Sequence, residues 1–412
     1  MDSYTFSVIL STVGLVLGLF LAYWIHSRHQ LEVHVPPTEI PENYPAPLIS
    51  IIVPARNEAR NIRRCVHSLF AQTYPNYELI IVNDRSTDAT AEILDEILRS
   101  AQDDKNAGQV GFESGKADAG GHREPPLHVL EGEEMPPGWA GKPHALVQGA
   151  EAAKGEWLCF IDADTFASRQ LISSTYQAAI LHRADMFTII TEQILGSFWE
   201  KVLIPVVFTG LSFGFPADQV NDPEQPNAIA NGQFILIRRA VYQATGGHRA
   251  VYDRIDEDKA IAELVKGAGY RLVLADGRAL ARTRMYTSFG ELWEGWTKNI
   301  FLGMQGRLAM LVFGGMLGLI GALGLPGWLL AGVVWWASGG GAPAAVVASE
   351  VLILCGVLLW LRSLAARAFN ISPLYAFTLP LGALIFTGMM FASAFKVLSG
   401  VGVTWKGRRY RA

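Results

Sequence analysis

Apolar residues form long runs at both ends of the chain and short runs in its middle. Residues 4–25 contain no charged side chain, and further apolar blocks follow residue 307. A run of about 20 apolar residues is long enough to cross a bilayer as a helix. The pattern therefore predicts a retained N-terminal transmembrane anchor over 1–26 and three or four transmembrane helices over 307–400.

The number of C-terminal helices depends on residues 308–337, which form a long run for one helix. Pro326-Gly327 can fold this run into a tight hairpin, which gives four segments in place of three. Four segments put the C-terminus on the cytosolic side, whereas three put it outside. Because Lys and Arg favour the cytosolic side, the basic tail over 401–412 favours four segments.

Between the ends, short apolar runs alternate with amphipathic stretches in a predicted domain over 48–284, which follows a polar linker over 27–47. Buried strands are predicted at 48–53, 77–82, 127–130 and 157–161. Continuous apolar strands that alternate with helices indicate an α/β fold, with a mostly parallel sheet and helices on both faces. Residues 100–126 have almost no large apolar side chain and are predicted to form a flexible insertion.

Two carboxylates, Asp162 and Asp164, follow the predicted strand at 157–161. Because a strand alternates its faces, both side chains are expected to point to the same side. The carboxyl ends of the strands form the ligand crevice of an open α/β sheet, where an acidic pair can hold a divalent metal against a phosphate. The alternative is a solvated acidic turn.

Composition and spacing exclude several function classes. Half of the 412 residues are hydrophobic, which is typical of a membrane protein, and the net charge of −4 gives no sign of a nucleic-acid partner. The three cysteines have no zinc spacing. A dinucleotide-binding dehydrogenase would carry G-x-G-x-x-G after the first strand, where this chain has Pro54-Ala55-Arg56-Asn57-Glu58. The P-loop pattern is absent as well.

Several motifs together resemble the family 2 glycosyltransferases over about residues 50–299. They are Val-Pro-Ala-Arg-Asn-Glu at 53–58, Asn-Asp-Arg-Ser-Thr-Asp at 83–88, Gly-Lys-x-x-Ala-Leu at 141–146 and Asp-Ala-Asp at 162–164. Asn231-Gly232-Gln233-Phe234 and Gly246-Gly247-His248 resemble the acceptor-side segment, and Asp256-Glu257-Asp258 resembles the catalytic Glu-Asp motif. The segments 254–258, 295–299 and 404–410 resemble the hopanoid-associated branch, which is related to the carotenoid and ceramide types.

This resemblance implies a GT-A sugar-nucleotide fold with transmembrane helices at both ends. It also implies Mg²⁺ or Mn²⁺ on Asp164, with Asp162 on the metal or the ribose. Asp84 would meet the base of the nucleotide, in a pocket lined by Pro54, Arg56 and Glu58. Structural alternatives remain open: Asp84 can cap the following helix, and Glu58 can start one.

Two further charged residues are assigned roles near the diphosphate and the acceptor. Lys142 is predicted at a helix start, where the helix dipole disfavours a cation and a bound phosphate would resolve the conflict. A snorkelling surface lysine is the alternative. By resemblance Asp258 is the general base, which implies inversion at the anomeric carbon; the alternative is an acidic first helical turn.

The segment at 293–299 departs from the Arg-Trp motif of many processive and lipid-acceptor relatives. Trp296 and Lys298 are the candidates for contacting the leaving group there. The alternative is an amphipathic helix over 285–306 that lies in the membrane interface, since its aromatic residues fall at helical spacing.

The sequence thus indicates an inverting, metal-dependent glycosyltransferase that uses a UDP-type donor and a membrane lipid or isoprenoid acceptor such as a hopanoid. Its catalytic domain is expected in the cytosol, where the donor is made, at the bacterial inner membrane. A processive polysaccharide synthase and a catalytically silent, nucleotide-binding membrane scaffold are the alternatives.

Overall fold

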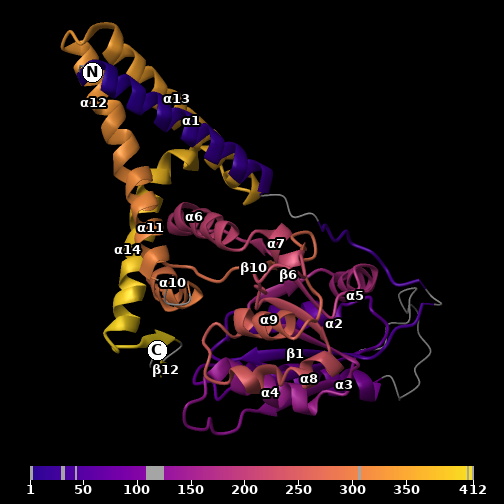
Figure 1. The fold of residues 1–412 in the computed structure, drawn as a ribbon. Helices are drawn as coiled ribbons and strands as arrows, with labels where there is room; N and C mark the ends of the chain where they lie inside the picture. The colour runs from indigo at the N-terminus through magenta and orange to yellow at the C-terminus, as the bar shows by residue number, and fades with distance from the viewer. Residues whose placement is uncertain are drawn as a thin grey trace. The chain divides into compact units, whose positions relative to one another are not determined.

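A computed structural model describes residues 3–28, 33–41, 44–107, 125–304, 308–405 and 408–410. The chain divides into two compact units, one built on a sheet and one built of helices (Figure 1). The sheet unit comprises Leu31–Ile194 and Ala217–Met285, and the helical unit comprises Met1–Gln30, Leu195–Pro216 and Tyr286–Ala412. Residues 195–216 therefore group with the helical unit, whereas the sequence placed them in the 48–284 domain.

The sheet unit is built on seven strands in the order β3-β2-β1-β4-β8-β6-β9. Their bounds are β1 Ile49–Ala55, β2 Tyr77–Asn83, β3 Leu127–Glu131, β4 Trp157–Ile161, β6 Met186–Ile190, β8 Phe234–Arg238 and β9 Leu272–Asp276. The two pairs that contain β8 are antiparallel, and the other pairs are parallel. The mostly parallel sheet expected from the apolar runs is confirmed. Strand order reverses between β1 and β4, which places a topological switch point there.

Helices cover both faces of this sheet (Figure 1). Their bounds are α2 Ile62–Phe70, α3 Thr90–Ala107, α4 Gly141–Ala152, α5 Leu171–Leu181, α7 Ala217–Asn221, α8 Arg239–Ala244, the 3-10 helix η1 Gly247–Val251 and α9 Glu257–Gly267. Ile51 and Val53 of β1 pack in one core with α2 and α5, whereas Ile52 faces Gly149 of α4 on the opposite side. Alternation along β1 thus buries both faces.

A smaller three-stranded sheet follows the acidic turn after β4. Its strands are β5 Thr165–Ala167, β10 Ala281–Thr283 and β7 Glu192–Gln193. Helix α3 continues to Ala107, into the range predicted as a flexible insertion. Residues 108–124 of that range lie outside the described residues.

Gly155, between α4 and β4, lies where the chain crosses the start of β1. A Cβ atom there would lie 2.5 Å from the backbone N of Ser50 and 2.7 Å from the carbonyl O of Leu48. Gly155→Ala is therefore expected to destabilise the sheet unit by about 1–3 kcal/mol, because backbone atoms must shift. Thermal unfolding of the full chain should occur at a lower temperature, by roughly 2–4 °C per kcal/mol.

The matched control is Gly267→Ala at the end of α9, where an added Cβ has nothing within 4 Å. This substitution should leave the unfolding temperature unchanged or raise it slightly. Equal unfolding temperatures for Gly155→Ala and the unmodified chain would contradict the close approach.

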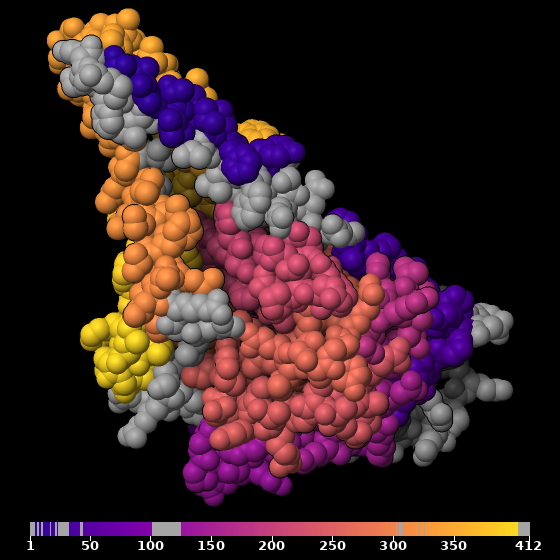
Figure 2. Space-filling model, viewed as in Figure 1, coloured from indigo at the N-terminus to yellow at the C-terminus, as the bar shows by residue number. Residues whose placement is uncertain are grey.

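The helical unit contains long apolar helices and shorter ones. Its elements are α1 Ser3–Arg28, α6 Phe198–Gly214, α10 Phe289–Gly303, α11 Leu308–Leu319, the π-helical turn η2 Ile320–Gly324, α12 Leu325–Ala337, α13 Gly341–Ala368, η3 Pro373–Thr378, α14 Leu379–Leu398, and the paired strands β11 Val403–Trp405 and β12 Arg408–Tyr410. In the predicted basic tail, Lys406 and Arg411 lie outside the described residues. Figure 2 shows α11 and α12 as an orange column of side chains, many of them exposed and apolar.

Three helices of the described chain are long and apolar enough to cross a membrane: Leu308–Ala337, Gly341–Ala368 and Pro373–Leu398. This is consistent with a membrane-associated protein. The predicted hairpin at Pro326-Gly327 is wrong, because α11, η2 and α12 form one continuous helix. Pro326 follows the π-helical turn η2 directly, and this local change in hydrogen bonding lets the helix continue past a residue without an N–H. The structure therefore supports three C-terminal segments rather than four.

Candidate active site

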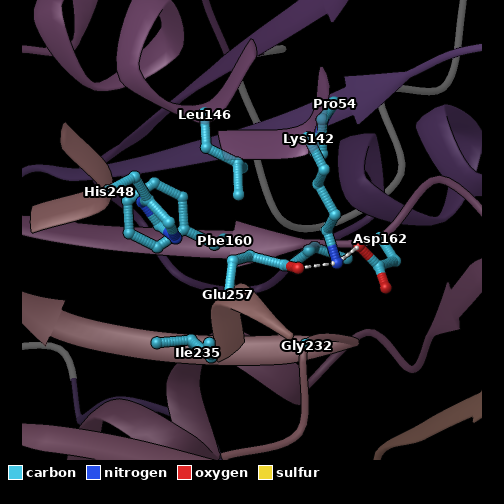
Figure 3. A pocket seen from close by; sticks show the side chains of 10 residues that line it. Pro54, Lys142, Leu146, Phe160, Asp162, Gly232, Ile235, His248 and Glu257 are labelled. Carbon is cyan, nitrogen blue, oxygen red and sulfur yellow. Dashed lines mark ion pairs between the residues drawn. The ribbon is translucent and has the colours of Figure 1, made fainter. Parts of the chain in front are cut away.

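The ends of β1 and β4, next to the switch point, contribute to a small pocket in the sheet unit (Figure 3). Pro54 comes from β1, Asp162 from the end of β4, and Lys142 from the first turn of α4. Further lining residues are Leu146, Phe160, Ile161, Gly232, Ile235, His248 and Glu257. Three of the predicted donor-binding residues are thus brought to one place by elements far apart in the sequence.

Lys142 is the central charge of this pocket. Its Nζ lies 2.7 Å from Asp162 Oδ1 and 2.7 Å from Glu257 Oε1 (Figure 3). Burial acts to lower the pKa of Lys142, but Asp162, Glu257 and Asp258 outweigh it and hold the pKa well above its usual value. The predicted conflict between this cation and the helix start is therefore resolved here by protein carboxylates.

The three consecutive acids at 256–258 take different partners. Arg254 donates from Nε and Nη2 to the two carboxylate oxygens of Asp256, at 2.8 and 2.7 Å. Glu257 forms an ion pair with Lys142. Asp258, unlike Asp256 and Glu257, has no ion pair within 4 Å among the described residues. Its Oδ2 accepts a hydrogen bond from Gly232 N (3.1 Å), and its Oδ1 accepts one from Lys259 N (2.8 Å).

Burial raises the pKa of Asp258, while the charge of Lys142 and the two backbone N–H groups partly oppose that rise. A carboxylate with a raised pKa, held by main-chain donors, fits a general base better than a paired surface acid does. Glu257 and Asp258 also occupy the first turn of α9, as the helix-start alternative required. The two interpretations are compatible.

Asp162 and Asp164 lie in a turn, because β4 ends at Ile161 and β5 begins at Thr165. Strand alternation therefore does not apply to them, and the expectation that both carboxylates point to one side stays a prediction. Thr283 of β10 holds this turn by donating from its hydroxyl to the carbonyl O of Asp164 at 3.3 Å.

Acidic side chains are concentrated around the buried thiol of Cys65. Burial raises the pKa of that thiol, and the charges of Asp164, Glu58 and Asp162 raise it further. Among the described residues there is no group of three or more His, Cys, Asp or Glu side chains placed to hold a metal ion. Carboxylate oxygens suit Mg²⁺ or Mn²⁺, which need only one or two of them when waters and phosphate complete the shell. The pair Asp162 and Asp164 stays the predicted site for such an ion.

The loops after β1 and β2 are tied together by Arg56. Its Nη1 donates to the carbonyl O of Asp84 (2.7 Å) and to that of Arg85 (3.0 Å). Asp84 is 5% exposed and lies six residues before α3, too far to cap that helix. Asp88 instead accepts a hydrogen bond from Thr90 N at the start of α3. Glu58 accepts the N–H of Ile62 on its carbonyl, so it opens the turn that leads into α2.

His248 lines the pocket but was quoted in the sequence only as part of a motif. Its ring lies 4.7 Å from that of Phe160, and Tyr242 Oη lies 3.1 Å from its Nδ1. Burial, assisted by Lys142, lowers the pKa of His248 to about 3, so the ring is neutral at pH 7. In the sequence, the two preceding glycines, Gly246 and Gly247, were the feature that marked the position of His248. Both have positive φ angles, 81° and 53°.

Trp296 and Lys298 belong to α10 in the helical unit. The indole of Trp296 is 8% exposed and packs against the rings of Phe208 and Tyr286. Lys298 is half-buried on the same helix. Trp296 is a core residue of its own unit, and the contacts of both residues with a leaving group stay predictions.

Comparison with known proteins supports the motif assignments. Residues 50–108 match the family described as glycosyl transferase family 2, and residues 121–412 match glycosyl transferase family 21. The 4,4'-diaponeurosporenoate glycosyltransferase of Staphylococcus aureus (strain USA300) is 25% identical over 319 residues, which cover 76% of this chain and 75% of that protein.

A solved structure extends the likeness to the fold. A mannosyltransferase from Pyrobaculum calidifontis, in complex with GDP-Man and Mn2+, has a TM-score of 0.51 and 18% identity, covering 96% of this chain and 99% of that one. At this identity the likeness concerns the fold alone, and it agrees with the expected GT-A class. The second family match extends over more than half of the chain, and the protein is therefore a glycosyltransferase that belongs to glycosyl transferase family 21.

Proposed function

We propose that the protein transfers a sugar from a nucleotide-diphosphate donor of the UDP type to a lipid or isoprenoid acceptor, such as a hopanoid, in the bacterial inner membrane. The observation that carries this proposal is the cluster in which Lys142 joins Asp162 and Glu257 next to Asp258. The three apolar helices support a membrane acceptor. A relative named for 4,4'-diaponeurosporenoate and the hopanoid-associated motifs support an isoprenoid-like one. The sheet unit would face the cytosol, where such donors are made.

In the proposed reaction the acceptor hydroxyl attacks the anomeric carbon and loses its proton to a carboxylate oxygen of Asp258. The new carbon–oxygen bond forms as the bond between the anomeric carbon and the diphosphate breaks, and the diphosphate leaves with the electron pair. One base and one direct displacement give inversion. The Gly232 and Lys259 N–H groups fix the carboxylate and leave its other lone pairs for the hydroxyl.

The donor would bind along the ends of β1, β2 and β4. Asp84, Arg56, Glu58 and Pro54 would hold the nucleotide, and Asp162 and Asp164 would hold the metal. A divalent ion held by these two residues would supply positive charge to neutralise the departing diphosphate. Lys142 Nζ, 2.7 Å from Asp162 Oδ1, would hold that carboxylate in place for the donor complex. The Mn2+ in the complex of the fold neighbour from Pyrobaculum calidifontis supports the choice of ion.

Removal of divalent metal tests this proposal and its alternatives together. Treatment of the purified chain with EDTA is expected to abolish sugar release from the donor, and Mn²⁺ or Mg²⁺ should restore it. The product then separates the classes: label in a lipid indicates the proposed transferase, label in a polymer indicates a polysaccharide synthase, and no donor turnover indicates a silent scaffold. Full turnover in EDTA would contradict the metal role of Asp162 and Asp164.

A further inference from the structure

The turn at 231–234, just before β8, brings a main-chain N–H to the carboxylate of Asp258. Gly232 N donates to Asp258 Oδ2 at 3.1 Å. The other N–H on this carboxylate, from Lys259, belongs to the helical turn that carries Asp258 itself. A Cβ atom on Gly232, which lines the pocket in Figure 3, would lie 3.0 Å from both Asp258 Oδ2 and Lys142 Nζ. The turn therefore approaches the proposed base closely from a separate element of the sheet unit.

A buried hydroxyl on the neighbouring strand closes this turn. Thr188 of β6 is 0% exposed. Its Oγ1 accepts a hydrogen bond from Asn231 N at 2.9 Å and donates one to the carbonyl O of Phe234 at 2.8 Å. It thus bridges the first and the last residue of the turn. For packing alone a valine of the same shape would fill this strand position, because a buried hydroxyl is costly unless its hydrogen bonds are made.

Closure of the turn also sets the direction of the Gly232 N–H. The carbonyl O of Asn231 accepts a hydrogen bond from Phe234 N at 2.9 Å, and Thr188 Oγ1 lies 3.4 Å from it. That carbonyl and the Gly232 N–H belong to one planar trans peptide, in which the two groups point in opposite directions. Because the carbonyl is directed toward Phe234 and Thr188, the N–H points away from them and toward Asp258.

Further polar side chains support the same turn. Asn231 Nδ2 donates to the carbonyl O of Ile189 at 2.9 Å, and Asn231 Oδ1 accepts a hydrogen bond from Gln233 N at 3.3 Å. Gln233 is 5% exposed, and its Oε1 accepts hydrogen bonds from the Thr191 hydroxyl and, at 3.3 Å, from Gln193 Nε2. A buried network whose hydrogen bonds are made rigidifies its members. The turn therefore presents Gly232 to Asp258 in a fixed geometry.

We propose that Thr188 is a positioning residue for the transfer reaction: its hydroxyl closes the turn at 231–234 and thereby aims the Gly232 N–H at the carboxylate of Asp258. This inference rests on the proposed function, in which Asp258 takes the proton of the acceptor. Gly232 holds Oδ2 in one place, so the carboxylate meets the acceptor hydroxyl in one orientation. A displacement of about 1 Å in such a group can lower a rate by about a hundredfold.

The first test compares variants of Thr188 in the transfer assay. Thr188→Val keeps the shape of the side chain but removes the hydroxyl, and kcat should fall by about 10–100-fold while the donor KM stays unchanged. Thr188→Ser keeps the hydroxyl and should restore most of kcat. The matched control is Thr175→Val in α5, where the buried Thr175 hydroxyl donates to the carbonyl O of Leu171 in the same helix; its kcat should not change.

Hydrogen exchange, followed by mass spectrometry on the full chain, tests the turn without the reaction. The amides at 231–234 should exchange at least about tenfold faster in Thr188→Val and at the normal rate in Thr188→Ser. Asn231→Ala, which removes side-chain support of the same turn, should raise the exchange rate and lower kcat in the same way. Unchanged exchange in Thr188→Val, or in Asn231→Ala where Thr188→Val does not fold, would overturn the inference.

The two measurements separate this inference from the proposed function. No transfer by the unmodified chain, or a near-normal kcat of Asp258→Asn, would contradict the proposed function, and the exchange rates would still decide whether Thr188 holds the turn. Transfer that is lost in Asp258→Asn but normal in Thr188→Val, despite faster exchange at 231–234, would overturn the positioning role alone.

Discussion

Asp258→Asn is expected to lower kcat by roughly 10²–10⁴, because the acceptor hydroxyl loses the carboxylate that takes its proton. The amide keeps the shape of the side chain and can still accept a hydrogen bond from Gly232 N or Lys259 N, so donor binding and folding should change little. The measurement is the rate of sugar transfer at saturating donor, together with the affinity for the donor. The matched control is Asp253→Asn, which removes an exposed carboxylate five residues earlier and should leave the rate unchanged.

The same role predicts a dependence on pH. The pKa of Asp258 is raised, chiefly by burial, so its ionised form is lost at a higher pH than for an exposed aspartate. A base must be ionised to accept a proton, and kcat/KM should therefore fall as the pH drops through this raised pKa. In Asp258→Asn, the residual kcat/KM should not show this fall at low pH. If Asp258→Asn had a near-normal kcat and the same fall of kcat/KM at low pH, another group would be the base.

Asp164→Ala is expected to abolish metal-dependent transfer. The side chain is a proposed metal ligand in the turn between β4 and β5, and neutralisation of the leaving diphosphate contributes several kcal/mol to the barrier. Each 1.36 kcal/mol is a factor of ten, so the rate should fall by at least about a hundredfold. Thr283 holds this turn through the main-chain carbonyl of residue 164, which the substitution keeps, so the fold should survive.

The measurement is transfer rate against Mn²⁺ concentration. If Asp164 is a ligand, added Mn²⁺ should not restore the full rate of Asp164→Ala. The matched control is Asp95→Ala, which removes an exposed carboxylate on α3. Its transfer rate should depend on Mn²⁺ concentration as that of the unmodified chain does. Normal turnover of Asp164→Ala at ordinary Mn²⁺ would show that the metal role is wrongly assigned.

The strands at the centre of the sheet could be predicted because each is a continuous apolar run closed by polar residues. The runs at 49–55, 77–83 and 157–161 are buried along their whole length or nearly so, and no other element accommodates such a pattern as readily. Acidic residues after the strands then had to lie at the carboxyl edge of the sheet. The positions of Asp84 and Asp162 followed from that rule.

Side-chain partners could not be predicted, since they depend on contacts across the chain. Lys142 finds Glu257 115 positions later, and the pairing of Asp256 with Arg254 leaves Asp258 distinct from its neighbours. The turn at 162–164 was considered only as the alternative to a metal-binding pair, because the strand pattern does not determine the backbone that follows it. The preference for four C-terminal helices over three was wrong because Pro-Gly is read as a turn, whereas here a π-helical turn lets the helix continue through Pro326.

The most direct test of the central claim is transfer of label from a panel of radiolabelled UDP-sugars by the purified chain in lipid, with and without Mn²⁺ or Mg²⁺. The label is counted in the organic phase. We expect lipid-bound label from at least one donor, only with metal present, and none with Asp258→Asn. No hydrolysis or transfer from any UDP-sugar, or label that appears only in a polymer, would contradict it.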